Sequence, residues 1–127
     1  MILDASVGAE VAVGSDVGRR ALLQLPDEVF VPELFFAEIH HVLRRLVSMK
    51  KLSRNVADSA HKALSRIHLV ALPVHHLENE LWQLSETISA YDAHYVVLAR
   101  ELNVPLATRD RRLAANRNLG VSFAVID

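Results

Sequence analysis

The chain opens with MILDASVGAEVAV, residues 1–13, and this segment predicts the fold class. Met1-Ile2-Leu3 is a very short apolar run that indicates a buried strand, and Asp4 ends the run with a carboxylate. Residues 6–13 favour a helix, for which Ser6 is the expected N-cap. A buried strand followed directly by a helix is typical of an α/β domain.

Strands and helices continue to alternate along the chain. Further strands are predicted at residues 29–31, 69–72, 104–108 and 121–126, and further helices at 17–25, 33–49, 53–67, 75–86, 91–102 and 109–117. The run 69–72 suits a fully buried strand, and Tyr91 and Tyr95 fall on one apolar face of their helix. We expect one α/β domain, residues 1–127, with a parallel sheet covered by helices on both faces.

Composition narrows the classes of protein that fit. The 127 residues are 51% hydrophobic and 23% charged, which suits one globular domain. Without cysteine there is no disulfide, thiolate metal site or cysteine nucleophile. No apolar run approaches the roughly 18 residues of a membrane span, and no basic region precedes Asp4, so we expect a cytoplasmic protein. A net charge of −1 argues against nucleic-acid binding by bulk positive charge.

Four acids occupy unusual places. Asp4 and Asp110 each follow a predicted strand, where the ligand crevice of a parallel sheet lies. Glu38 borders the apolar stripe of its helix, and Asp92 lies in the first turn of another helix. Four converging carboxylates would repel one another, and Mg²⁺ or Mn²⁺ would relieve that repulsion. Alternatively, the three aspartates are ordinary helix N-caps and Glu38 pairs with an arginine.

Four segments resemble the motifs of the PIN-domain family, and most closely those of its VapC-type toxins. They are LDASV (3–7), VPELFFAEI (31–39), YDA (91–93) and LATRDRRL (106–113), in the family's order and spacing over nearly the whole chain. The resemblance implies a parallel sheet of about five short strands. It also implies a Mg²⁺- or Mn²⁺-dependent endoribonuclease that is usually a homodimer and is inhibited by a cognate antitoxin protein.

The resemblance also implies site residues. Asp4, Glu38, Asp92 and Asp110 match the acidic quartet, with Glu38 either a metal ligand or the acceptor that orients the attacking water. Supporting positions fall on Ser6, Thr108, His41 and Asn116. His41 stands where members often carry Asn, and Asn116 is the one candidate after the last motif, which leaves one or two metal ions open.

Basic residues near the acids are candidates for contact with the RNA backbone. Arg109, Arg111 and Arg112 flank Asp110, and Arg44-Arg45 lie two turns beyond Glu38. For Arg44, Lys50, Lys51 and Arg54 a solvated helix face is the simpler interpretation.

Other functions fit the sequence less well. The glycines do not form the G-x-G-x-x-G of a dinucleotide-binding domain, and Ser6 stands where an aspartyl phosphatase needs a second acid. A DNA flap nuclease would need more chain. The serious alternative is a catalytically idle PIN-like module that binds RNA or a protein, although an idle site would gain stability by losing some of its acids.

Overall fold

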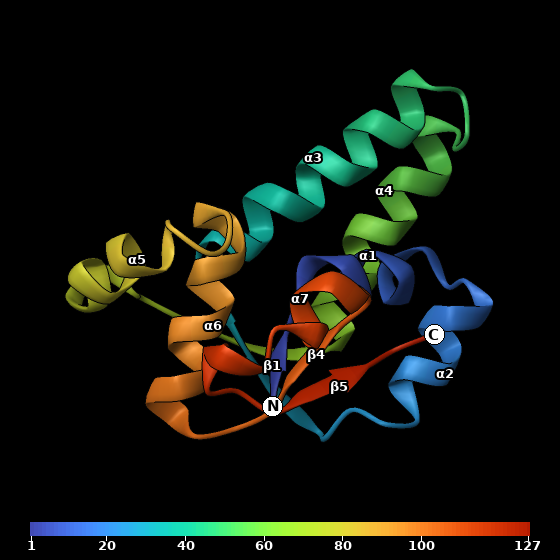
Figure 1. Ribbon diagram of the computed structural model, residues 1–127. Helices are drawn as coiled ribbons and strands as arrows, with labels where there is room; N and C mark the ends of the chain where they lie inside the picture. The colour runs from blue at the N-terminus through green and yellow to red at the C-terminus, as the bar shows by residue number, and fades with distance from the viewer.

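Five short strands run parallel in one sheet, in the order β3-β2-β1-β4-β5 (Figure 1). The computed structural model describes residues 1–127. The strands are β1 (Ile2–Leu3), β2 (Glu28–Pro32), β3 (His68–Leu72), β4 (Leu106–Thr108) and β5 (Phe123–Val125). The prediction of an α/β fold with about five parallel strands is therefore confirmed.

Seven α-helices connect and cover the strands. They are α1 (Ala5–Val13), α2 (Asp16–Leu22), α3 (Leu34–Ser48), α4 (Arg54–Ala63), α5 (Glu78–Leu84), α6 (Ala90–Leu102) and α7 (Arg111–Ala115), with single 3₁₀ turns η1 (Leu64–Arg66), η2 (His75–Leu77) and η3 (Arg117–Leu119). In Figure 1, α5 and α6 lie to the left of the strands, and α1, α2 and α4 lie to the right. Helices therefore cover both faces of the sheet, as the sequence predicts.

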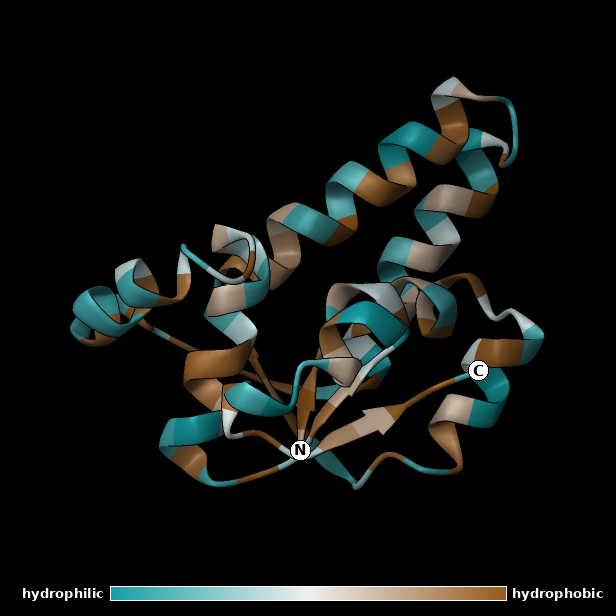
Figure 2. Ribbon diagram, in the orientation of Figure 1, coloured by the Kyte–Doolittle hydropathy of each residue, from teal (hydrophilic) through white to brown (hydrophobic).

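The core is centred on β1, the middle strand. Ile2 pairs with Phe30 of β2 on one side and with Leu106 of β4 on the other, and both Ile2 and Leu3 are fully buried. Parallel strands covered on both faces need continuous apolar runs, and the central strands are accordingly mostly brown in Figure 2. A strand of two residues is long enough for β1, because the paired strands β2 and β4 supply the rest of the buried sheet.

Some local predictions are wrong. The strand at 68–72 is an edge strand with only half-buried or exposed residues, because β2 flanks it on one side alone. Asp4, not Ser6, is the N-cap of α1, and its carboxylate accepts from the Ser6 amide. The helix predicted at 75–86 begins with a 3₁₀ turn, and Tyr91 is 61% exposed at the start of α6.

Gly8 lets α1 approach α3 closely. A Cβ atom at this position would lie 2.6 Å from Cζ of Phe35, a side chain fully buried in α3. Only a residue without a side chain fits here. The close contact packs α3, which carries Glu38, against α1, the helix that follows Asp4.

Beyond this contact, α3 continues outward and forms a hairpin with α4 that projects from the body (Figure 1). Phe35, Ile39 and Leu43 bury the inner face of α3, and Lys50, in a left-handed conformation with φ 58°, helps the chain turn back. None of the helices combines the length and apolarity needed to span a membrane.

Candidate active site

The candidate site lies at β1, because the chain adds strands first on one side of β1 and then on the other. From β1 the chain moves outward to β2 and β3, then crosses back to β4 and β5 on the other side of β1. Open parallel sheets bind ligands at such a switch point, beyond the carboxyl ends of the strands. Asp4 directly follows β1 and Asp110 lies two residues after β4, so both acids stand at this edge.

One buried hydroxyl links Asp4 to Asp110. Thr108, 0% exposed at the end of β4, donates its hydroxyl proton to Oδ2 of Asp4 at 2.6 Å. The same oxygen, Oγ1 of Thr108, accepts from the Asp110 amide at 3.0 Å. Ser6 also donates to Oδ2 of Asp4, at 2.8 Å, and its hydroxyl accepts from the Arg109 amide at 3.1 Å. Ser6 and Thr108 therefore fix the first and last acids relative to each other.

Asp110 is also an N-cap. Its Oδ1 accepts from the amides of Arg112 and Leu113 at 2.8 and 2.9 Å, which satisfies the free amides at the start of α7. The N-cap alternative is thus true of Asp4 and Asp110 as local structure. An ionised carboxylate has about four lone-pair sites on its two oxygens, so capping and metal binding are compatible.

Asp92 is not an N-cap, because Ser89 fills that position in α6. The Ser89 hydroxyl accepts from the Asp92 amide at 3.1 Å. Burial raises the pKa of Asp92, and the negative charges of Asp4 and Asp110 raise it further. Asp92 therefore lies in the electrostatic field of both strand-end acids.

Glu38 accepts a hydrogen bond that the sequence did not indicate. Tyr95, 1% exposed in α6, donates its hydroxyl proton to Oε1 of Glu38 at 2.8 Å. Burial raises the pKa of Glu38, the bond from Tyr95 opposes this, and the charges of Asp4 and Asp92 raise the pKa further. Burial and the Glu38 charge also raise the pKa of Tyr95. The sequence signal that could have indicated this bond is the hydroxyl group of Tyr95, which lies one helical turn after Asp92 on an otherwise apolar helix face.

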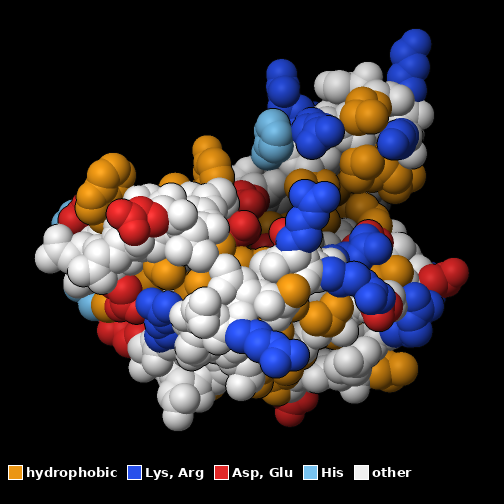
Figure 3. All heavy atoms as spheres, viewed as in Figure 1, with side chains coloured by type: hydrophobic (Ala, Val, Ile, Leu, Met, Phe, Trp, Pro, Cys, Tyr) orange, Lys and Arg blue, Asp and Glu red, His pale blue; other side chains and the backbone are white.

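The four acids thus come from β1, α3, α6 and α7 and repel one another in one region of the molecule. Figure 3 shows red acidic side chains in a hollow near the centre of the view. No three acidic or histidine side chains are already arranged as a metal-binding group. Water molecules or small side-chain movements must therefore complete any metal shell.

Of the four predicted supporting residues, three lie at the acids and Asn116 does not. Ser6 and Thr108 contact Asp4 directly, and His41 lines a hollow of about 460 Å³ together with Glu38 and Tyr91. Asn116 instead accepts from the Asn118 amide at 3.2 Å and makes no hydrogen bond to any of the four acids. Asn116 therefore adds no further ligand to the acidic site.

Two of the three arginines beside Asp110 are already paired. Arg109 forms an ion pair with Glu10, and Nη2 of Arg111 lies 2.7 Å from Oδ1 of Asp127. The Arg112 side chain is exposed and has no ion-pair partner. Of this group, Arg112 is the one whose charge is free.

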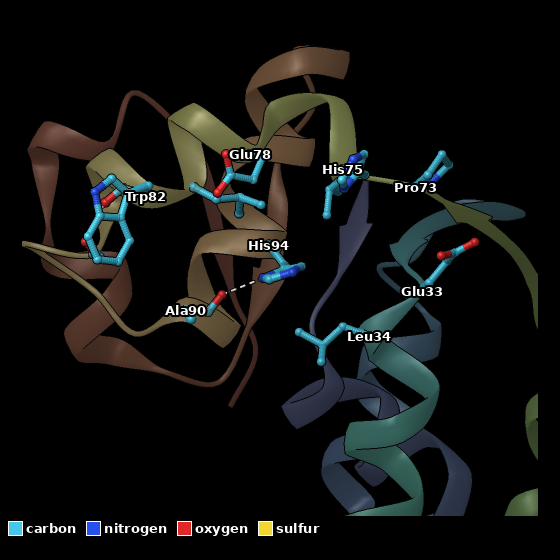
Figure 4. Close-up of a pocket in the computed structure, with 11 residues that line it drawn as sticks. Glu33, Leu34, Pro73, His75, Glu78, Trp82, Ala90 and His94 are labelled. Carbon is cyan, nitrogen blue, oxygen red and sulfur yellow. Dashed lines mark hydrogen bonds between the residues drawn. The ribbon is translucent and has the colours of Figure 1, made fainter.

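A larger hollow, about 520 Å³, lies beside the acids and contains none of them (Figure 4). Trp82 and Glu78 of α5, His75 and Leu34 line it, together with His94, whose Nδ1 donates to the Ala90 carbonyl at 2.5 Å. The charge of His94 also lowers the pKa of Glu38. His94 therefore lies between this hollow and the acids.

Comparison with known proteins gives the family. The family model of the PIN domain matches residues 1–119. The chain belongs to the PIN domain family. Ribonuclease VapC1 of Mycobacterium tuberculosis, a relative, is 36% identical over an alignment of 130 residues that covers 98% of this chain and 96% of the relative. Ribonuclease VapC9 of the same species is 34% identical over 114 residues, 90% of this chain and 88% of the relative.

Solved structures of low sequence identity share this PIN-domain fold. A toxin–antitoxin complex from Klebsiella pneumoniae aligns with a TM-score of 0.69 at 15% identity, over 98% of this chain and 95% of the other. PAE2754 from Pyrobaculum aerophilum aligns with a TM-score of 0.67 at 20% identity, over 96% and 81%. At these identities the likeness concerns the fold alone.

Proposed function

We propose that this PIN domain is a metal-dependent endoribonuclease that hydrolyses RNA phosphodiester bonds, and that it is the toxin of a toxin–antitoxin pair. Relatives named as VapC ribonucleases, 34–36% identical over most of the chain, support the activity. The observation that carries the proposal is the gathering of Asp4, Glu38, Asp92 and Asp110 at the switch point of the sheet, where Thr108 joins Asp4 to Asp110 and neighbouring carboxylates repel one another. A protein without need of a cation gains nothing from such repulsion.

The donor set fits a hard divalent cation, Mg²⁺ or Mn²⁺. Asp4, Asp92 and Asp110 offer carboxylate oxygens, the ligands that these ions prefer, and Mg²⁺ usually keeps several waters besides one or two carboxylates. When bound, such an ion lowers the pKa of a coordinated water and stabilises charge on the phosphate. The hydroxyls of Ser6 and Thr108 hold the Asp4 carboxylate in a fixed orientation for this role.

Glu38 serves as a further ligand or as the acceptor that orients the attacking water. Its raised pKa suits a group that takes up a proton from water, because a more basic carboxylate is a better acceptor. Tyr95 holds Oε1 of Glu38, and Oε2 has no hydrogen-bond partner within the chain. Tyr95 is therefore a positioning residue, and His41 lies next to Glu38 in the same hollow.

A cognate antitoxin and a second copy of the chain are the proposed protein partners. The solved toxin–antitoxin complex of the same fold is consistent with this. Exposed apolar side chains such as Trp82, Tyr91 and Phe36 offer contact area. With cellular RNA as the substrate, we expect the protein to act in the cytoplasm. A catalytically idle module that binds RNA or protein is the alternative.

The decisive experiment incubates the pure protein with total RNA, with EDTA, Mg²⁺ or Mn²⁺, and maps the ends produced. Asp92→Asn is the test variant, because Asp92 caps no helix. Asp16→Asn is its matched control, since Asp16 also lies in the first turn of a serine-capped helix, far from the site. We expect metal-dependent cleavage at defined positions that Asp92→Asn abolishes and Asp16→Asn retains. Cleavage that survives Asp92→Asn, or RNA left intact with both metals, would rule out this site as a nuclease centre.

A further inference from the structure

Half of the chain's lysines and arginines lie on the projecting hairpin. Residues 44–66, here called the basic arm, contain seven of the 14 cationic side chains and one acid, Asp58. The seven are Arg44, Arg45, Lys50, Lys51, Arg54, Lys62 and Arg66, and all are exposed. In the next 33 residues, 67–99, there is no lysine or arginine. The basic arm is therefore strongly positive, although the net charge of the whole chain is near zero.

The charges of the basic arm are nearly all free. Arg54 pairs with Asp58 at 3.0 Å, and none of the other six cations has an ion-pair partner. Figure 3 shows blue side chains spread over the arm, above the red side chains of the hollow. Six unpaired cations on one thin hairpin repel one another, so a polyanion that binds there gains from each of them.

Helix α3 connects the basic arm to the acids. Arg45 follows Glu38 by seven residues, which is two helical turns, so Arg45 lies on the same face about 10 Å further along the axis. His41 lies between them on this face and lines the hollow that contains Glu38. Tyr91, 61% exposed on the wall of that hollow, presents an aromatic ring on which an unpaired base can stack.

We propose that the basic arm binds the phosphate backbone of single-stranded RNA on one side of the cleavage position. The strand leaves the acids along the Glu38 face of α3, passes His41 and Arg45, and continues toward Lys50 and Lys51. This inference rests on the proposed endoribonuclease function and adds the path of its substrate. It replaces the solvated-face interpretation of Lys50 and Lys51.

RNA is favoured over other occupants by the pattern of charge. The basic arm offers few large apolar side chains to a folded partner beyond Met49 and Val56, which are 52% and 46% exposed. A group of unpaired cations next to the acids instead suits the repeated negative charges of a nucleic-acid backbone. The sequence-independent contact of lysine and arginine with phosphate positions RNA without selecting a sequence.

The test measures binding of a fluorescein-labelled single-stranded RNA in EDTA, by anisotropy, over a range of salt concentrations. Arg45→Gln with Lys51→Gln removes two charges from the arm. Arg19→Gln with Arg20→Gln removes two adjacent exposed charges from α2 and serves as the matched control. Arg45→Lys with Lys51→Arg keeps both charges. Melting curves and light scattering accompany every variant.

The arm variant is expected to bind RNA roughly 5- to 25-fold more weakly in about 0.1 M salt, with the slope of log affinity against log salt smaller by about 1.4. The α2 control and the charge-keeping variant should bind within about twofold of the wild type. The proposal is overturned if the arm and α2 variants lose equal affinity, if the wild type binds no RNA, or if the arm variant only changes the oligomeric state.

Binding in EDTA separates this proposal from the proposed function. A wild type that cuts RNA with Mn²⁺ while both double variants bind alike refutes the arm path alone. A wild type that never cuts RNA but loses binding through the arm variant refutes the nuclease and retains the arm as an RNA-binding surface.

Discussion

Glu38 and Asp92 have raised pKa values because burial and neighbouring acids both oppose their charge. The site therefore stores unfavourable free energy in the metal-free protein. The hydrogen bond from Tyr95 and the charge of His94 offset this only in part at Glu38, and no ion pair is formed by any of the four acids.

Asp92→Asn should make the metal-free protein more stable at neutral pH. The variant removes repulsion by Asp4 and Asp110, worth about 1 kcal/mol, which corresponds to a rise in Tm of roughly 3–5 °C. A carboxyl with a raised pKa stabilises the fold below its ordinary value, 3.8 for Asp92, and this stabilisation is lost as pH rises through the raised value. The advantage of Asn over Asp should therefore grow with pH above about 4 and then level off.

Calorimetry of both proteins between acid and neutral pH, with and without Mn²⁺, checks this. Mn²⁺ at about 100 times its Kd should raise the stability of the wild type by roughly 2.7 kcal/mol, and that of Asp92→Asn by less. The Asp16→Asn control should respond to Mn²⁺ like the wild type. A variant that melts below the wild type in EDTA and responds fully to Mn²⁺ would contradict the metal role of Asp92.

At the scale of secondary structure, the starts of α1, α6 and α7 each position an acid. Asp4 begins α1, Asp110 begins α7, and Ser89 begins α6 three residues before Asp92. The partial positive charge at a helix N-terminus favours these carboxylates. Asp4 and Asp110 therefore serve both as helix caps and as acids of the site, which is why local sequence patterns point to both roles.

Ser89→Ala should weaken metal binding as well as stability. Loss of an N-cap costs about 1 kcal/mol and frees the first turn of α6, which carries Asp92. Ser53→Ala is the matched control, because Ser53 caps α4 in the same way by accepting from the Val56 amide at 3.2 Å. Both variants should lose similar stability in EDTA, and only Ser89→Ala should lose Mn²⁺ affinity in titration calorimetry. Equal Mn²⁺ affinity in both variants would separate the α6 cap from the metal site.

The molecule as a whole is divided by charge and by apolar exposure. The basic arm extends on one side, and residues 67–99 on the other side carry exposed aromatic side chains without any lysine or arginine. Trp82 is 74% exposed and is the only tryptophan. Exposed aromatic residues beside a hollow are typical of protein interfaces.

A homodimer that buries the Trp82 side should be visible by light scattering at micromolar concentration. Trp82→Ser should shift the equilibrium toward the monomer, because burial of a large aromatic side chain contributes roughly 2–3 kcal/mol. Leu23→Ser is the control, since Leu23 is 87% exposed on another part of the molecule. The emission of Trp82 should move to shorter wavelength as the protein concentration rises. A monomer at every concentration, with unchanged emission, would exclude this dimer.

Local sequence patterns were enough to predict how strands and helices alternate along the chain, the parallel α/β class and the places of the four acids at strand ends and on helices. These features depend on local patterns: apolar runs such as Ile2–Leu3, capping residues, and carboxylates directly after strands. Strands of a parallel sheet are buried on both faces and therefore read as continuous apolar runs, which is enough to indicate the class. Local physics therefore sufficed for the fold class.

Only the tertiary structure decided which of these residues meet. The bond from Thr108 to Asp4 joins residues 104 positions apart, and that from Tyr95 to Glu38 joins residues 57 apart. The pairing of Arg109 with Glu10, 99 positions away, is equally non-local. Such contacts depend on the strand order β3-β2-β1-β4-β5, which brings β1 beside β4 and leaves β3 at an edge. No local pattern encodes that order, because it results from the packing of all helices against one shared core.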